Sequence, residues 1–174
     1  TLTIGLIADV KEASEANLKN VNKFVADFKA AKVDIIAVAG DIAEKQEQIE
    51  SVLTALAGTG LPVGVVIGNR EGTGAFQAAV GAVQNKHSNV VNLNKVRRVD
   101  TPNADLVSLP GYYKTDYLHA KDGCTYGEEE LKGLAQLKEA CDSTIILISH
   151  GAPKQTGADA IDRTSEGANV GDPA

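Results

Sequence analysis

Four apolar segments of this chain are each followed by a side chain that can bind a metal ion. Asp9 follows the first segment, and Asp41 and Asn69 each follow a glycine at the end of the next two. His150 comes directly after the last one. Carboxylate, amide oxygen and imidazole are ligands for divalent metals such as Mn, Fe, Mg or Zn. The pattern therefore predicts a metal site built from Asp9, Asp41, Asn69 and His150.

Two basic residues stand close to these candidate ligands in the sequence. Lys11 follows Asp9 by two positions, and Arg70 follows Asn69 directly. A protonated lysine cannot ligate a metal, and arginine has no lone pair with which to act as a general acid or base. Lys11 and Arg70 are therefore predicted to contact a phosphate or to form ion pairs, rather than to transfer protons.

Helix capping is the simpler explanation for either aspartate taken alone, because Asp is a frequent N-cap residue. Capping does not account for Asn69 and His150. In an open α/β sheet, ligand sites form outside the carboxyl ends of the strands, which is where all four residues are expected.

The first half of the chain alternates between strand-like and helix-like patterns. This alternation predicts an α/β fold with a parallel sheet and helices on its faces. The expected strands are 2–8, 33–39 and 62–67, and the expected helices are 16–32, 44–57 and 72–86.

The second half has a different pattern. Short strands at 90–93, 96–99 and 106–109 have no helix between them and suggest a meander with a tight connection at Asn94 and Lys95. A loop over 110–126 contains all four tyrosines and could line a substrate rim or contact a partner. A helix over 128–140 and a buried strand over 144–149 follow, and 151–174 is predicted to be loop.

Composition indicates one globular domain over residues 1–174. The hydrophobic share is 43%, the charged share is 23% and the net charge is −6. An acidic chain of this kind argues against a broad nucleic-acid footprint, and no apolar run approaches the ~20 residues that span a bilayer. Cys124 and Cys141 could pair or remain free.

The chain contains no methionine, and its first strand begins at Leu2. Residues before Thr1 are therefore expected to have been removed, either with a signal peptide or by shortening of the chain. Cytoplasmic and secreted locations both stay open.

These motifs resemble those of the calcineurin-like metallophosphoesterase superfamily. Asp9, Gly40-Asp41, Gly68-Asn69 and Ser149-His150 follow that family's order and spacing. The resemblance implies a four-layer α/β/β/α sandwich. It also implies two metals, with Asp41 bridging them, Asp9 serving the first, and Asn69 and His150 serving the second. Two such metals clamp the attacking and leaving oxygens of a phosphoester.

The sequence departs from the family pattern in three places. Lys11 stands where the family has its first histidine, Arg70 stands where it has the catalytic histidine, and the closing Gly-His-x-His segment is absent. The C-terminal part of the sandwich is therefore expected to be missing. We expect Lys11 to lie within salt-bridge distance of Asp9 or Asp41 in place of the first metal. One divalent metal at Asp41, Asn69 and His150 and a metal-free site are equal alternatives.

Three functions remain open from the sequence. The first is a divergent homologue that has lost most or all phosphoester hydrolysis but keeps phosphate or metal binding. The second is a structural or interaction protein, which could contact a protein partner or a second copy through an exposed sheet edge near residue 150. The third is an active phosphodiesterase or phosphatase with a non-standard site.

Overall fold

A parallel sheet of four strands organises the first half of the chain in the computed structural model, which describes residues 1–160 and 162–173. Each strand pairs with its neighbour in chain order, so the predicted alternation of strand and helix is confirmed. The strands are β1 (Ile4–Ile7), β2 (Ile35–Ala39), β3 (Val63–Val66) and β4 (Val90–Asn92).

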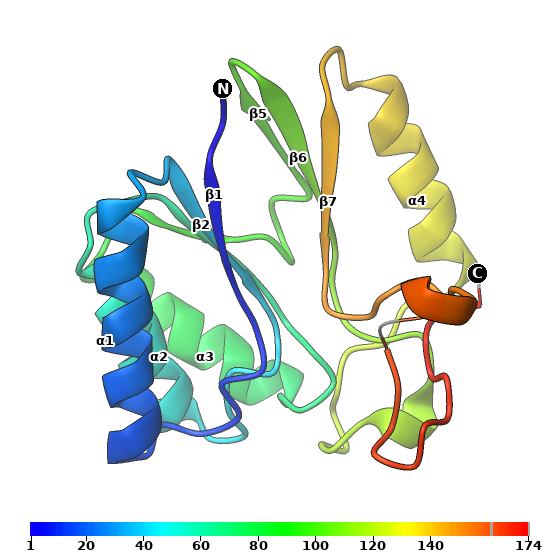
Figure 1. Cartoon of the computed structure of the whole chain (residues 1–174), viewed down its shortest axis with the longest axis horizontal. Coiled ribbons are helices and arrows are strands. Elements are labelled where there is room, and N and C mark those ends of the chain that lie inside the picture. Colours follow the sequence, from blue (N-terminus) through cyan, green and yellow to red (C-terminus); the bar gives the residue numbers. More distant parts are fainter. Residues whose placement is uncertain (161, 174) are drawn as a thin grey trace.

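Three helices cover one face of this sheet (Figure 1). They are α1 (Glu15–Ala30), α2 (Gln46–Ala57) and α3 (Thr73–Gln84). Their apolar residues recur at helical spacing, and burial of that stripe against the sheet stabilises helices of this length. Val38 on the sheet, Leu53 on α2 and Phe76 on α3 are all completely buried in the resulting core.

A smaller sheet of three strands and a fourth helix form the second half. β5 (Arg98–Thr101) is antiparallel to β6 (Ala104–Leu109), and β6 is parallel to β7 (Ile145–Ser149). α4 (Glu128–Glu139) connects to β7 and lies on the far side of the smaller sheet (Figure 1).

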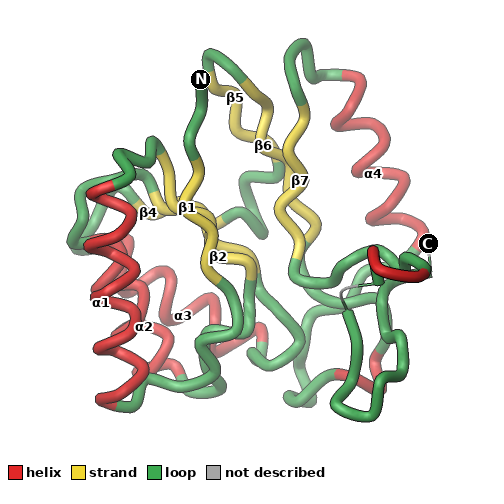
Figure 2. The backbone as a smooth tube through the Cα atoms, viewed as in Figure 1, coloured by secondary structure: helices red, strands yellow, loops and turns green. Residues whose placement is uncertain are grey.

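The two sheets face each other, with helices outside both (Figure 2). A second apolar cluster fills the space between the sheets and includes Ala37, Val66, Leu93 and Ile148. The four layers are thus helices, sheet, sheet and helix. The predicted α/β/β/α sandwich is confirmed.

The predicted meander is wrong. β4 pairs with β3 in the larger sheet, whereas β5 pairs with β6 in the smaller one. The tight turn expected at Asn94 and Lys95 is present, but it carries the chain from one sheet to the other. Leu93 is buried between the two sheets, and this packing draws β4 to the larger sheet.

β7 is an edge strand among the described residues, so the expected exposed edge next to His150 is confirmed. Ile145 and Leu147 on this strand are 40% and 49% exposed. The chain beyond His150 is mainly loop as predicted, with one short 3-10 turn at Gly157–Asp159. Residues 161 and 174 of that predicted loop lie outside the described part.

Cys124 and Cys141 are free thiols. None of the helices in the described ranges has both the length and the apolar character needed to cross a membrane.

Gly64 on β3 tests the packing between the sheets. A Cβ at this position would lie 2.8 Å from Leu93 Cδ1, well inside normal carbon contact. Gly64→Ala should therefore lower the free energy of unfolding by about 1–3 kcal/mol, measured by urea denaturation. Leu93→Ala removes the obstructing atoms, so the double variant should lose less than the sum of the two single losses.

Gly81→Ala is the matched control, because a Cβ there meets no atom within 4 Å and the residue lies inside α3. It should leave stability unchanged or raise it by up to about 1 kcal/mol. If the free energy of unfolding that the double variant loses equals the sum of the two single losses, Gly64 and Leu93 do not pack against each other as described.

Candidate metal and phosphate site

Two glycine turns bring the ends of β2 and β3 into contact. A Cβ at Gly40 would lie 2.6 Å from Gly68 Cα, and a Cβ at Gly68 would lie 2.5 Å from Asp41 N. No side chain fits between these backbones, so both positions require glycine. Asp41 itself has a φ of 52°, a strained value that aims its side chain across the turn.

Glu71 links the two turns by accepting hydrogen bonds from the backbone of both. Its carboxylate accepts hydrogen bonds from the backbone N–H groups of Gly68 at 2.9 Å and Ala43 at 3.2 Å, and also from that of Ile42. The side chain is completely buried. Burial raises the pKa of Glu71 above its ordinary value of 4.5, and the backbone donors act in the opposite direction. Glu71 therefore positions both turns through buried backbone contacts.

Three of the predicted ligands, Asp41, Asn69 and His150, have side chains that contact one another. His150 Nε2 lies 2.9 Å from Asn69 Oδ1 and 3.3 Å from Asp41 Oδ1. His150 Nδ1 faces Ala39 O at 2.8 Å, and Asn69 Nδ2 donates to Tyr117 O at 2.6 Å. Asp41 and His150 side chains are only 7% and 10% exposed. Three of the four predicted ligands thus converge on one point.

Asp9 lies farther out, together with Lys11. Lys11 Nζ is 3.2 Å from Asp9 Oδ1, so an ion pair of Lys11 with one of the two aspartates is present as expected. Both side chains are about half exposed, however, and Lys11 forms no ion pair with Asp41 in the described part of the chain. Of the two aspartates, Lys11 therefore pairs with Asp9. The reason is local: Asp9 and Lys11 both have positive φ, which turns this loop outward.

Arg70 forms ion pairs. Its guanidinium lies 2.8 Å from Glu44 Oε1 and 3.7 Å from Asp41 Oδ2. It does not line the neighbouring cavity. Of the two predicted roles for Arg70, the structure contains the ion pair.

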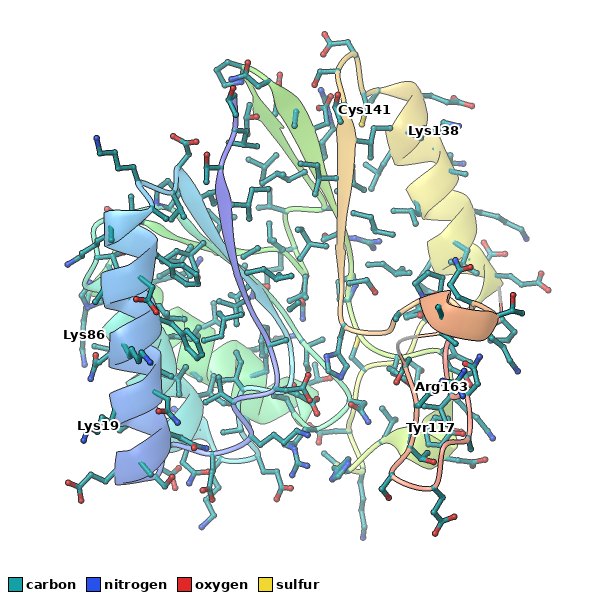
Figure 3. All side chains as sticks on the ribbon, viewed as in Figure 1. Lys19, Lys86, Tyr117, Lys138, Cys141 and Arg163 are labelled. Atoms are coloured by element: carbon teal, nitrogen blue, oxygen red, sulfur yellow. The ribbon has the colours of Figure 1, made fainter. Side chains whose placement is uncertain are left out.

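A cavity of about 590 Å³ opens beside the three converging side chains. All four predicted ligands line it, so the strand-end residues do share one crevice. The tyrosine loop supplies a wall, as one interpretation of the sequence expected, and Tyr117 is labelled in Figure 3. The full lining is Asp9, Asp41, Asn69, Tyr112, Asp116, Tyr117, Leu118, His119, His150, Ala152, Asp162, Thr164 and Val170.

The hydroxyl groups of three tyrosines also form hydrogen bonds with the C-terminal loop beside this cavity. The Tyr112 hydroxyl lies 3.1 Å from Asp162 Oδ2, and the Tyr113 hydroxyl donates to Val170 O at 3.2 Å. The Tyr126 hydroxyl donates to Asp172 Oδ2. Burial, followed by the charge of Asp162, raises the pKa of Tyr112. These hydroxyls therefore stay protonated and hold the loop as donors.

Several cavity residues were not predicted from the sequence. Asp116 and Asp162 come from segments that carry no periodic pattern, and His119, which is 44% exposed, follows no strand. Glu71 comes directly after Arg70 in the chain, and no spacing in the sequence indicates that it joins two turns.

Within the described ranges, no three His, Cys, Asp or Glu side chains form a group that could hold a metal ion. The convergent group differs from such a cluster because the amide of Asn69 supplies its third donor atom.

Residues 2–170 match the family model of calcineurin-like phosphoesterases. The chain therefore belongs to the calcineurin-like phosphoesterase family, and the resemblance drawn from its motifs is confirmed. No curated protein matches it.

Solved structures share the fold. The protein TT1561 of Thermus thermophilus has a TM-score of 0.68 at 16% identity, covering 99% of this chain and 74% of that one. A dimetal phosphatase from Danio rerio has a TM-score of 0.62 at 15% identity, covering 88% of this chain and 70% of that one. At such identities the likeness is one of fold alone.

Glu71→Gln tests the anchor below the site. The amide keeps the shape but replaces one accepting oxygen with a donor group that faces backbone N–H groups. Leaving buried donors without acceptors costs about 1–3 kcal/mol, and chemical denaturation should measure a loss of this size. Glu139→Gln, at an exposed position of α4, is the control and should change little. Equal stabilities for the two variants would exclude the anchoring role.

Proposed function

We propose that this chain binds one divalent cation through Asp41, Asn69 and His150, and binds phosphate esters in the adjoining cavity, with hydrolysis lost or much reduced. A cation bound there would act as a Lewis acid toward a phosphoryl oxygen. The family membership supports the chemistry, and the donor set supports the single ion.

The main support for this proposal is the direction of the lone pairs on His150, Asn69 and Asp41. Ala39 O can only accept a hydrogen bond, so His150 Nδ1 must be the protonated nitrogen. Asn69 Nδ2 donates to Tyr117 O, so Asn69 Oδ1 faces the imidazole. In neutral His150, the lone pair of Nε2 then points at an amide oxygen and a carboxylate oxygen. The lone pairs of these three atoms repel one another. A cation bound between them would accept all three lone pairs and remove that repulsion.

The charge of the cavity supports the same conclusion. Its described lining includes Asp9, Asp41, Asp116 and Asp162 but no lysine or arginine. A phosphate ester is anionic and would be repelled by these carboxylates. A divalent cation at the convergent site supplies the positive charge that phosphate binding requires.

Weak hydrolysis follows from the residues at positions 11 and 70. Asp9, the remaining ligand for a first metal, is paired with Lys11. Arg70 cannot act as a general acid or base and is held by Glu44. General acid–base catalysis is typically worth 10²–10⁴-fold in rate, so its loss reduces turnover strongly.

Metal titration tests the single ion. Isothermal calorimetry with Mn²⁺ or Zn²⁺ should give one ion per chain. His150→Ala should weaken that binding by on the order of 100-fold or more, because changes even to outer-shell groups cost 10–100-fold. His87→Ala, which alters a histidine outside the cavity lining, is the matched control and should bind normally. Two ions per chain, or an unchanged affinity in His150→Ala, would refute the assignment.

Restoring the family residues tests the reduced hydrolysis. The double variant Lys11→His, Arg70→His regains a metal ligand and a proton-transfer group. Its rate with bis(p-nitrophenyl) phosphate and Mn²⁺ should exceed that of the parent by on the order of 100-fold. A parent chain as fast as the double variant would instead identify an active enzyme with a non-standard site.

A further inference from the structure

The cavity extends beyond the proposed ion, and its outer wall combines aromatic rings with carboxylates. Tyr112 and Tyr117 lie edge to face, with ring centroids 5.8 Å apart. Asp116 and Asp162, from two different loops, line the same space. None of these four side chains is a proposed ligand of the ion, so all four are available to contact what binds next to it.

The charge of this outer wall is negative and favours a cationic group. Asp116 and Asp162 give this wall two negative charges, against the one positive charge of Lys114, which pairs with Asp116. Carboxylates and the electron-rich faces of tyrosine rings attract ammonium groups. A ligand with several negative charges, such as a nucleoside triphosphate, is disfavoured by the same wall.

An ammonium group of the chain itself already uses this combination. Lys114 Nζ lies 3.3 Å from Asp116 Oδ2 and 5.0 Å from the centroid of the Tyr117 ring. Lys114 is not a lining residue, whereas both of its partners are. Asp116 and Tyr117 are thus spaced to hold an ammonium group between them.

The opposite part of the wall is held in place. Tyr112 is buried, with 6% of its surface exposed, and its hydroxyl contacts Asp162 and Val170 O. These contacts hold the ring and the carboxylate against each other before any ligand arrives. Preorganisation of this kind lowers the entropy cost of binding.

We propose that the cavity selects phosphate esters whose alcohol carries an ammonium group. The phosphate contacts the ion at Asp41, Asn69 and His150, and the ammonium contacts Asp116, Asp162 and the two tyrosine rings. This inference rests on the proposed function, because it needs the ion to hold the phosphate.

Two ligands of matched shape test it. Phosphocholine and 3,3-dimethylbutyl phosphate differ in that a quaternary nitrogen replaces a carbon, so only the first carries the positive charge. Calorimetric titration of the whole Mn²⁺-loaded chain should show phosphocholine binding roughly tenfold tighter, the size expected from cation–π and carboxylate contacts. The titration needs no turnover, so it does not depend on residual hydrolysis.

Single substitutions test whether the outer wall causes the preference for phosphocholine over 3,3-dimethylbutyl phosphate. Asp116→Asn and Asp162→Asn should each reduce the ratio of the two affinities, whereas Glu139→Gln on α4 should not. Lys114→Gln removes the competing ammonium and should strengthen phosphocholine binding. If the wall instead attracted anionic ligands, Lys114→Gln would weaken binding of ADP, and ADP would bind tighter than phosphocholine.

The outcomes separate the two proposals. Equal affinity for the matched ligands, or a ratio unchanged by both aspartate variants, overturns the ammonium preference and leaves the metal site intact. Binding of neither ligand to the Mn²⁺-loaded chain overturns phosphate binding as well.

Discussion

The site depends on one buried carboxylate. Glu71 accepts hydrogen bonds from backbone groups on both the β2 turn and the β3 turn, which lie far apart in the sequence. The two turns also touch through their glycines and through Asp41, whose Oδ1 accepts hydrogen bonds from the N–H groups of Asn69 and Arg70. Glu71 therefore supplies buried acceptors to the strained backbone at Asp41 and to the turn that carries Asn69. Asn69 is further held by its contacts with Asp41 and Tyr117 O.

Burying that carboxylate has an electrostatic consequence. Glu71 and Asp41 lie close together with little solvent between them, and the charge of Asp41 contributes to the raised pKa of Glu71. Asp41 is partly compensated by Arg70 on one side and by the backbone N–H groups of Asn69 and Arg70. The proposed cation would compensate it on the other side. The same clustering of negative charge would thus favour metal binding.

Much of the fold could be predicted because periodicity and strand ends are local signals. Asp9, Asp41, Asn69 and His150 could be grouped without coordinates, since parallel strands deliver their carboxyl ends to one edge. The sheet to which β4 belongs could not, because a short apolar strand fits a meander and a parallel edge equally well. Only the packing of Leu93 between the sheets decides it. Asp116 and Asp162 were missed for a related reason: loop residues meet through space, with no spacing in the chain to indicate it.

The basic residues at positions 11 and 70 lie beside a site whose backbone frame does not depend on them. Lys11 and Arg70 both pair with aspartates of the site, yet each does so from outside the cavity. Neither contacts Glu71 through any hydrogen bond within the described residues, so the anchor that orders the turns is unaffected. The backbone contacts that order the two turns are therefore separate from the ion pairs at positions 11 and 70. Arg70 compensates the buried charge of Asp41, whereas Lys11 pairs with Asp9 at a half-exposed position, so loss of Arg70 costs more stability than loss of Lys11.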